Sequence, residues 1–217
     1  MGTTASPATI AKAIEHLVRH DARLSSVIES VNKHPTITPH NNYYQELVES
    51  IVSQQLSVKA AATILKRFVA LFPETTFPSP EQILQNDIET FRSVGLSRQK
   101  ATYIQDLAVK VIEGTVQFNH LDGLSNEDVI AELRQIKGVG VWTVHMFLIF
   151  CMGRLDVLPT GDLGIKNGIQ KLYELEERPS AETIEAIAHE HGWHPYESVA
   201  SWYVWQSLDT MPALETE

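Results

Sequence analysis

Apolar residues recur at helical spacing along almost the whole chain, and this periodicity limits the fold more than any other feature. In residues 8–20, for example, the apolar side chains fall on one stripe of an amphipathic helix. No segment has sustained alternation of apolar and polar residues between hairpin turns, so we expect essentially no sheet. The fold class is therefore all-α, with around ten short helices. The other predicted helices are 43–54, 58–71, one starting at 80, 101–112, 126–136, 162–173, 181–191 and 195–209.

Capping residues mark where several of these helices begin and end. Ser57 precedes one helix, and Ser79 with Pro80 at the first helical position precedes another. Ser125 or Asn126 caps a third, while Gly114 is a typical C-terminal stop. Helix boundaries are therefore predicted locally, whereas residues 32–42 form a Pro-containing loop.

The charge balance and the single cysteine exclude several classes of protein. The chain has 27 acidic and 17 basic residues, a net charge of −10, so it does not bind nucleic acid mainly through bulk positive charge. Cys151 alone excludes an internal disulfide and any four-cysteine zinc or iron–sulfur site built by this chain. Neither a secretory signal nor an apolar stretch long enough to cross a membrane is evident. We expect an intracellular monomer, in the cytoplasm or nucleoid, or in the nucleus of a eukaryote.

The segment "IKGVGVWTVHMF" predicts two helices joined by a tight glycine hairpin. Gly138 can adopt positive φ and end the first helix, and Gly140 removes a side chain where the next one begins. Val139 would pack into the hairpin. The first amides of the second helix lie at the positive end of its dipole and can bind a phosphate without lysines. An ordinary helix–helix turn is the alternative.

Four segments together resemble the helix-hairpin-helix (HhH-GPD) superfamily of DNA glycosylases, closest to the 3-methyladenine DNA glycosylase II type of alkylation repair. They are "IKGVGVWTVHMFLIF…RLDVLPTGDLGIKNG", "ESIVSQQLSVKAAATILKRF", "VGLSRQKATYIQDLA" and "YESVASWYVWQSL", covering most of residues 43–209. The resemblance implies a helical glycosylase fold in two lobes with the active-site cleft between them, without the N-terminal sheet domain of larger bacterial members. We divide the chain into residues 1–42, which complete one lobe, residues 43–135, a helical lobe, and residues 136–217, with the hairpin, the catalytic loop and the C-terminal helices packing back on the N-terminal lobe.

The resemblance makes Asp162 the catalytic residue. A carboxylate near C1′ of the sugar stabilises the positive charge that develops as the glycosidic bond breaks, and it can orient or deprotonate water. An N-cap without chemistry is the alternative. Related sequences often carry two consecutive acids here, whereas this chain has Gly161–Asp162.

Trp142 occupies the position where glycosylases that also cut the backbone carry a Schiff-base lysine. We therefore expect a monofunctional hydrolase without lyase activity. Some relatives hold an iron–sulfur cluster, for which this chain lacks the cysteines. The expected cofactors are none, apart from a monovalent cation that hairpins of this type often hold.

The resemblance also suggests contacts with the DNA. Trp142 and Trp205 would form a pocket for a flipped base, with Trp202 and Tyr43 as further candidates, and core packing is the alternative for each. Gln55 or Leu56 would wedge into the duplex, or belong to a simple polar turn. The residues expected at the DNA are Lys137, Gly138, Val139, Gly140, Thr143 and Lys166, with Lys59, Lys66, Arg98 and Lys100 as further basic candidates.

The expected function is base flipping and release of alkylated purines such as 3-methyladenine and 7-methylguanine from duplex DNA, which starts base excision repair. A non-catalytic homologue that binds damaged or abasic-site DNA is the alternative. The sequence "HEHGWH" does not indicate a metal site, because His189 and His191 lie about 200° apart around a helix. No metal ligands are predicted.

Overall fold

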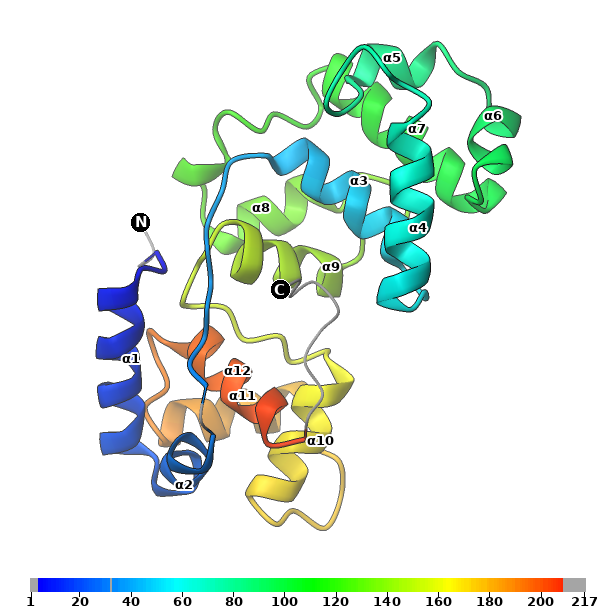
Figure 1. Ribbon diagram of the computed structural model, residues 1–217. Coiled ribbons are helices and arrows are strands. Elements are labelled where there is room, and N and C mark those ends of the chain that lie inside the picture. The colour runs from blue at the N-terminus through cyan, green and yellow to red at the C-terminus, as the bar shows by residue number, and fades with distance from the viewer. Residues whose placement is uncertain (1–3, 32, 209–217) are drawn as a thin grey trace. The chain divides into compact units, whose positions relative to one another are not determined.

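The computed structural model describes residues 4–31 and 33–208, and the regular elements among these are all helical (Figure 1). The one pairing of extended backbone there is an isolated bridge between Thr4 and Arg154, so the all-α prediction is confirmed. No helix in this part of the chain is long and apolar enough to cross a membrane. The described residues form α1 (Pro7–His20), α2 (Ala22–Ser30), α3 (Tyr43–Ser53), α4 (Val58–Val69), α5 (Pro80–Leu84), α6 (Ile88–Ser93), α7 (Arg98–Ile112), α8 (Asn126–Leu133), α9 (Val141–Met146), α10 (Leu163–Leu172), α11 (Ala181–Glu190) and α12 (Glu197–Gln206), with a 3₁₀ turn at Leu121–Gly123 and a π-helical turn at Phe147–Cys151.

The chain folds into two compact units. The terminal unit contains residues 1–41 and 145–217, and the central unit contains residues 42–144. The division falls within α9 rather than at residue 135, so the glycine hairpin belongs to the same unit as the turn after α3.

The predicted helix caps of the central unit are confirmed. The hydroxyls of Ser57, Ser79 and Ser125 each accept a hydrogen bond from a backbone amide in the first turn that follows. Ser125, not Asn126, is the cap of α8. Gly114 has φ of +73° directly after the end of α7, as expected of a helix stop. These boundaries follow from local chemistry and needed no tertiary information.

Helix α7 is the central support of its unit and contacts α3, α5 and α6. Its inward face is fully buried at Ala101, Ile104, Leu107 and Ala108. Its other face reaches the hairpin and the turn after α3, as described below.

The terminal unit is built around α12, which contacts α1, α2 and α10. Every residue from Ser198 to Trp205 is buried, and a helix that is buried on all sides is expected at the centre of a core. The helix was predicted to run to Asp209, which lies outside the described residues.

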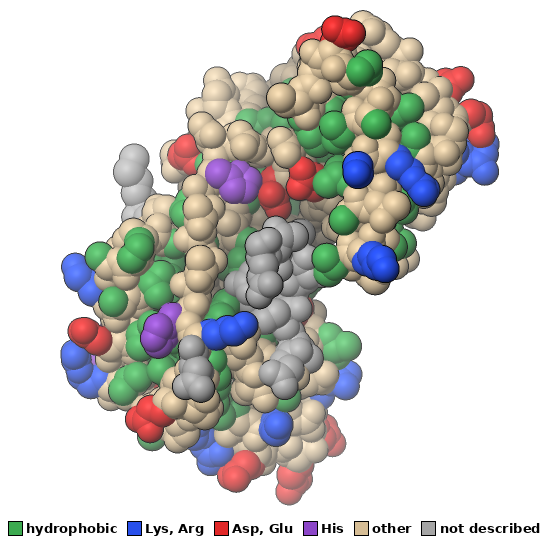
Figure 2. Space-filling view, viewed as in Figure 1, with side chains coloured by type: hydrophobic (Ala, Val, Ile, Leu, Met, Phe, Trp, Pro, Cys, Tyr) green, Lys and Arg blue, Asp and Glu red, His purple; other side chains and the backbone are tan. Residues whose placement is uncertain are grey.

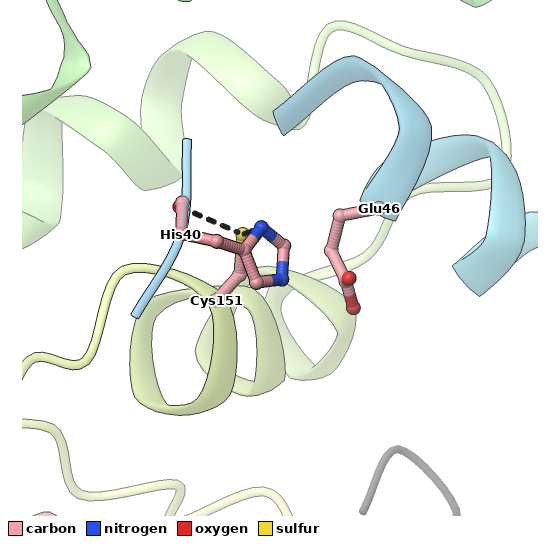
Figure 3. A group of neighbouring side chains, drawn as sticks. All are labelled: His40, Glu46 and Cys151. Carbon is pink, nitrogen blue, oxygen red and sulfur yellow. Dashed lines mark hydrogen bonds between the residues drawn. The ribbon is translucent and has the colours of Figure 1, made fainter. Parts of the chain in front are cut away.

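An extended segment, residues 33–41, runs along the terminal unit and is fixed to the end of the π-helical turn. The amide of His40 donates to the carbonyl of Cys151 at 3.0 Å, and the Sγ of Cys151 lies 3.7 Å from the Nδ1 of His40 (Figure 3). Cys151 is buried, and its thiol faces a histidine rather than a second cysteine. Helices α2 and α6 and the π-helical turn were not predicted.

A buried carboxylate connects distant parts of the terminal unit. Asp21 caps α2 by accepting from Leu24 N at 2.9 Å, and it also accepts from Trp193 Nε1 at 2.8 Å and from the Tyr173 hydroxyl. Burial, and then the bond to Asp21, raise the pKa of Tyr173, so this hydroxyl stays protonated and donates. Asp21 therefore satisfies three donors that would otherwise be lost in the core.

Replacing Asp21 by alanine is expected to lower the free energy of unfolding by roughly 3–5 kcal/mol, because a cap is lost and two buried donors are left without acceptors. Urea denaturation measures the change. Asp87→Ala is the matched control, since Asp87 caps α6 in the same way through Thr90 N but is exposed. Equal losses in the two variants would show that the buried network adds nothing.

Candidate functional site

The glycine hairpin has the predicted backbone geometry. Gly138 has φ of +81°, which ends the turn after α8. Val139 is only 6% exposed and its amide donates to Ile136 O at 3.1 Å, so it packs inside the hairpin as expected. The carbonyl of Gly140 accepts from Val144 N at 3.1 Å and starts α9.

Residues on one face of α7 contact this hairpin. A Cβ atom at Gly138 would lie 2.1 Å from Cδ2 of Tyr103, so the ring packs directly against the glycine. One turn further along α7, Asp106 accepts from the amide of Lys137 at 2.8 Å and pairs with its ammonium at 3.2 Å. Lys137, a predicted DNA contact, is thus exposed but already paired with a carboxylate.

The turn between α3 and α4 is a type II β-turn. Leu56 N donates to Ser53 O at 3.1 Å, and the first central residue, Gln54, has φ −46° and ψ 127°. The second, Gln55, has φ of +58°, a region that favours glycine. For another residue this conformation costs roughly 1–2 kcal/mol. Gln55 is exposed whereas Leu56 is half-buried, so Gln55 forms the tip of the turn.

Two polar side chains hold this turn in place. Lys100 on α7 donates from Nζ to the carbonyls of Val52 at 2.8 Å and Gln54 at 2.6 Å. Burial lowers the pKa of this lysine. The side-chain amide of Gln54 donates to the carbonyl of Gly138 at 2.9 Å and thereby joins the turn to the hairpin. Lys100 was expected at the DNA face, and the sequence contains no signal for these two contacts because both are tertiary.

Helix α4, which follows the turn, carries a local positive patch on this acidic protein. Lys59, Lys66 and Arg67 are exposed on it, and the helix contains no acidic residue. Figure 2 shows basic side chains over this helix. Because the chain as a whole is acidic, a contact with DNA requires positive charge at a local surface. This patch provides such charge.

Trp142 lies in the first turn of α9 and is 42% exposed, whereas the next residue along the chain is buried. Thr143 is 7% exposed, so its side chain packs inside, and its contact with DNA stays a prediction. Burial lowers the pKa of His145, one turn beyond Trp142.

Asp162 is the N-cap of α10 and is 8% exposed. Its Oδ1 accepts two hydrogen bonds, from Ile165 N at 2.8 Å and from Trp205 Nε1 at 2.8 Å. The capping interpretation is therefore confirmed as geometry, and it does not conflict with a chemical role. Lys166 is half-buried one turn further on and donates its amide to Asp162 O at 3.0 Å.

Trp205 was expected in the pocket for a flipped base; it is fully buried, and its indole N–H donates to Asp162. Its ring is stacked on Phe150 with centroids 6.1 Å apart. A Cβ atom at Gly164 would lie 2.9 Å from Trp205 Cδ1 and 3.0 Å from Asp162 Oδ1. Glycine at this position therefore lets the indole approach the carboxylate.

The other two pocket candidates are also buried. Trp202 is 3% exposed and meets Tyr203 edge-on with centroids 5.0 Å apart. Tyr43 is 6% exposed and its hydroxyl donates to Asp122 Oδ1 at 2.5 Å. Among the four predicted pocket aromatics, Trp142 alone has a substantial exposed surface. Trp202 therefore packs in the core, which was the alternative interpretation for this residue.

The three histidines of "HEHGWH" make separate contacts. His189 is exposed, the ring of His191 packs on Tyr173 at 5.0 Å between centroids, and Nδ1 of His194 lies 2.9 Å from Oε1 of Glu197. The described contacts of His191 and His194 are thus with neighbouring protein side chains.

Comparisons with known proteins identify the family of the chain. A model of the HhH-GPD superfamily base excision DNA repair proteins matches residues 48–192. DNA-3-methyladenine glycosylase 1 of Schizosaccharomyces pombe is 38% identical over 165 residues, 76% of this chain and 72% of the relative. The alkylbase DNA glycosidase-like protein mag2 of the same yeast is 32% identical over 90% of this chain and 92% of its own length.

A solved structure of S. pombe 3-methyladenine DNA glycosylase in complex with abasic DNA aligns with a TM-score of 0.76. It is 34% identical and covers 94% of this chain and 100% of its own. The alignment thus spans both units, and the residues that the superfamily model matches include the hairpin and Asp162. The chain therefore belongs to the HhH-GPD superfamily of base excision DNA repair proteins.

Proposed function

We propose that this protein is a monofunctional DNA glycosylase of the 3-methyladenine II type. It hydrolyses the N-glycosidic bond of alkylated purines in duplex DNA and leaves the abasic strand uncut. The observation that carries the proposal is the Asp162 carboxylate, held at the start of α10 by the Trp205 indole and a backbone amide. Relatives named DNA-3-methyladenine glycosylases support the substrate class.

In the proposed reaction the purine leaves with the electrons of the C1′–N9 bond, and water adds to C1′. Asp162 stabilises the positive charge on the sugar as the bond breaks, and takes the proton that the water loses. Methylation at N3 or N7 makes the purine cationic and a better leaving group, so one carboxylate suffices. The exposed ring of Trp142 suits a cationic base through cation–π attraction.

Trp142 also supports the absence of lyase chemistry, because an indole cannot form a Schiff base with the sugar. The reaction as proposed needs no cofactor. A monovalent cation would bind at the hairpin. An iron–sulfur cluster would need cysteines that this sequence does not contain.

We propose that DNA is bound by the hairpin, by the exposed basic residues of α4 and by the turn whose tip is Gln55, which would fill the gap left by a flipped base. The protein would act as a monomer, in the nucleoid or the nucleus, where chromosomal DNA lies.

Asp162→Asn is expected to reduce release of free methylated purines from dimethyl-sulfate-treated duplex DNA at least a hundredfold, because the charge is lost at the sugar. Asparagine still caps a helix and retains an oxygen for the indole N–H, so the fold should persist. Borohydride should trap no covalent complex with the wild type, since hydrolysis involves no Schiff base. Covalent trapping, or full activity in the variant, would contradict this mechanism.

Trp205→Phe is expected to lower kcat about tenfold with little change in KM, because it removes a hydrogen bond to the carboxylate while keeping an aromatic ring in place. Trp193→Phe is a matched control: it removes the same kind of bond, to the buried Asp21. The control should lower the melting temperature and leave kcat unchanged. Equal kcat values for the two variants would show that the bond to Asp162 has no role in catalysis.

Gly138→Ala is expected to weaken binding to abasic-site duplex at least tenfold, because the new methyl group would overlap the ring of Tyr103 and the backbone has positive φ. Gly123→Ala is the control within the same unit, since a Cβ atom there meets nothing within 4 Å and Gly123 is not among the expected DNA contacts. Fluorescence anisotropy gives both dissociation constants. Similar weakening in the two variants would argue against a shape requirement at Gly138.

A non-catalytic protein that binds abasic-site DNA is the second candidate. It is favoured by Gly161, which stands where related sequences often carry a second acid. The same assay separates the two candidates: a wild-type protein that binds abasic duplex tightly and releases no base is the binding protein.

A further inference from the structure

The tip of the turn between α3 and α4 has a strained backbone that needs support. Gln55 has φ of +58° without being glycine, and it is exposed, so its own side chain shows no contact that would hold this conformation. A residue in such a conformation persists only where neighbouring groups determine it. The groups that do so here come from two different parts of the central unit.

The first group is the ammonium of Lys100. It donates to two carbonyls at the C-terminal end of α3, those of Val52 and Gln54, at 2.8 and 2.6 Å. These carbonyls lie at the negative end of the α3 dipole, where a cation is favourable. Lys100 therefore holds the peptide that immediately precedes Gln55.

The second group is the side-chain amide of Gln54, which donates to Gly138 O at 2.9 Å. Gly138 is itself fixed by the ring of Tyr103, which lies one turn beyond Lys100 on α7. The turn and the hairpin are thus connected twice, directly through Gln54 and indirectly through α7.

We propose that Lys100 and Gln54 are positioning residues that preset the tip at Gln55 relative to the hairpin, so that the protein meets damaged DNA with the gap-filling turn already formed. This inference rests on the proposed function, in which Gln55 fills the space left by the flipped base. Neither residue needs to touch the DNA. Lys100 acts through the two carbonyls, and its loss should affect recognition of a gap more than general attraction to DNA.

Lys100→Met and Gln54→Met test the proposal, because each removes the polar contacts and keeps a side chain of similar length. The measurement is the ratio of the dissociation constant for intact duplex to that for duplex with a single abasic-site analogue. Both variants should lose about tenfold of this preference, with little change in affinity for intact duplex. 2-Aminopurine opposite the abasic site should show weaker quenching, since the tip no longer stacks in the gap.

Lys110→Met is the matched control. It lies on the same helix, carries the same charge and is ten residues from Lys100, about 15 Å along the axis. It should leave the preference and the quenching unchanged. Gln54 is at the surface of its unit and caps no helix with its side chain, so Gln54→Met keeps the test valid should Lys100→Met fail to fold.

Wild-type preference in a folded Lys100→Met or Gln54→Met variant, while the wild type releases methylated purines, would overturn the positioning role alone. A loss in Lys110→Met equal to that in Lys100→Met would also overturn it, because charge rather than position would then matter. Failure of the wild type to release any base would instead reject the proposed enzyme function, and the binding ratio would still report on the turn.

Discussion

The contact between Gly138 and the ring of Tyr103 is the constraint on which the central unit's surface depends. A side chain on residue 138 would overlap that ring, and a residue with positive φ is needed there to turn the chain into α9. Because α7 also holds Lys137 through Asp106 and the neighbouring turn through Lys100, one helix face sets the geometry of two loops.

This arrangement explains how an acidic chain can belong to a superfamily of DNA repair proteins. A net charge of −10 makes long-range attraction to DNA unfavourable. The basic residues of α4 provide positive charge locally, and the start of α9 offers backbone amides whose dipoles need no lysine. Two lysines near the hairpin face protein groups instead: Lys137 pairs with Asp106 and Lys100 binds carbonyls. In the proposed function, the position of these groups, rather than total charge, makes the surface suitable for DNA.

The terminal unit places a hydrogen-bonded carboxylate inside a hydrophobic core. Asp162 combines a structural role, capping α10, with a bond from a fully buried indole that is stacked on Phe150. Gly164 provides the room for that approach. Trp205 is accordingly a support for the carboxylate, and the same unit uses a similar device where Trp193 donates to Asp21. In both places the buried carboxylate accepts an indole N–H and a helix-initiating amide.

The sequence by itself determined the helical class, the serine caps, the glycine hairpin and the position of Asp162 at a helix start, because each follows from periodicity or from hydrogen bonds within a few residues. It did not determine the support of the turn by Lys100 and Gln54, the burial of Trp205 or the packing of Thr143. A lysine near a helix start has the same local pattern whether it faces phosphate or a carbonyl 46 residues earlier in the chain. A tryptophan on an apolar helix likewise suits a pocket wall or a core. Only the tertiary structure decided these cases, because the partner that satisfies each polar atom is brought close by packing between helices.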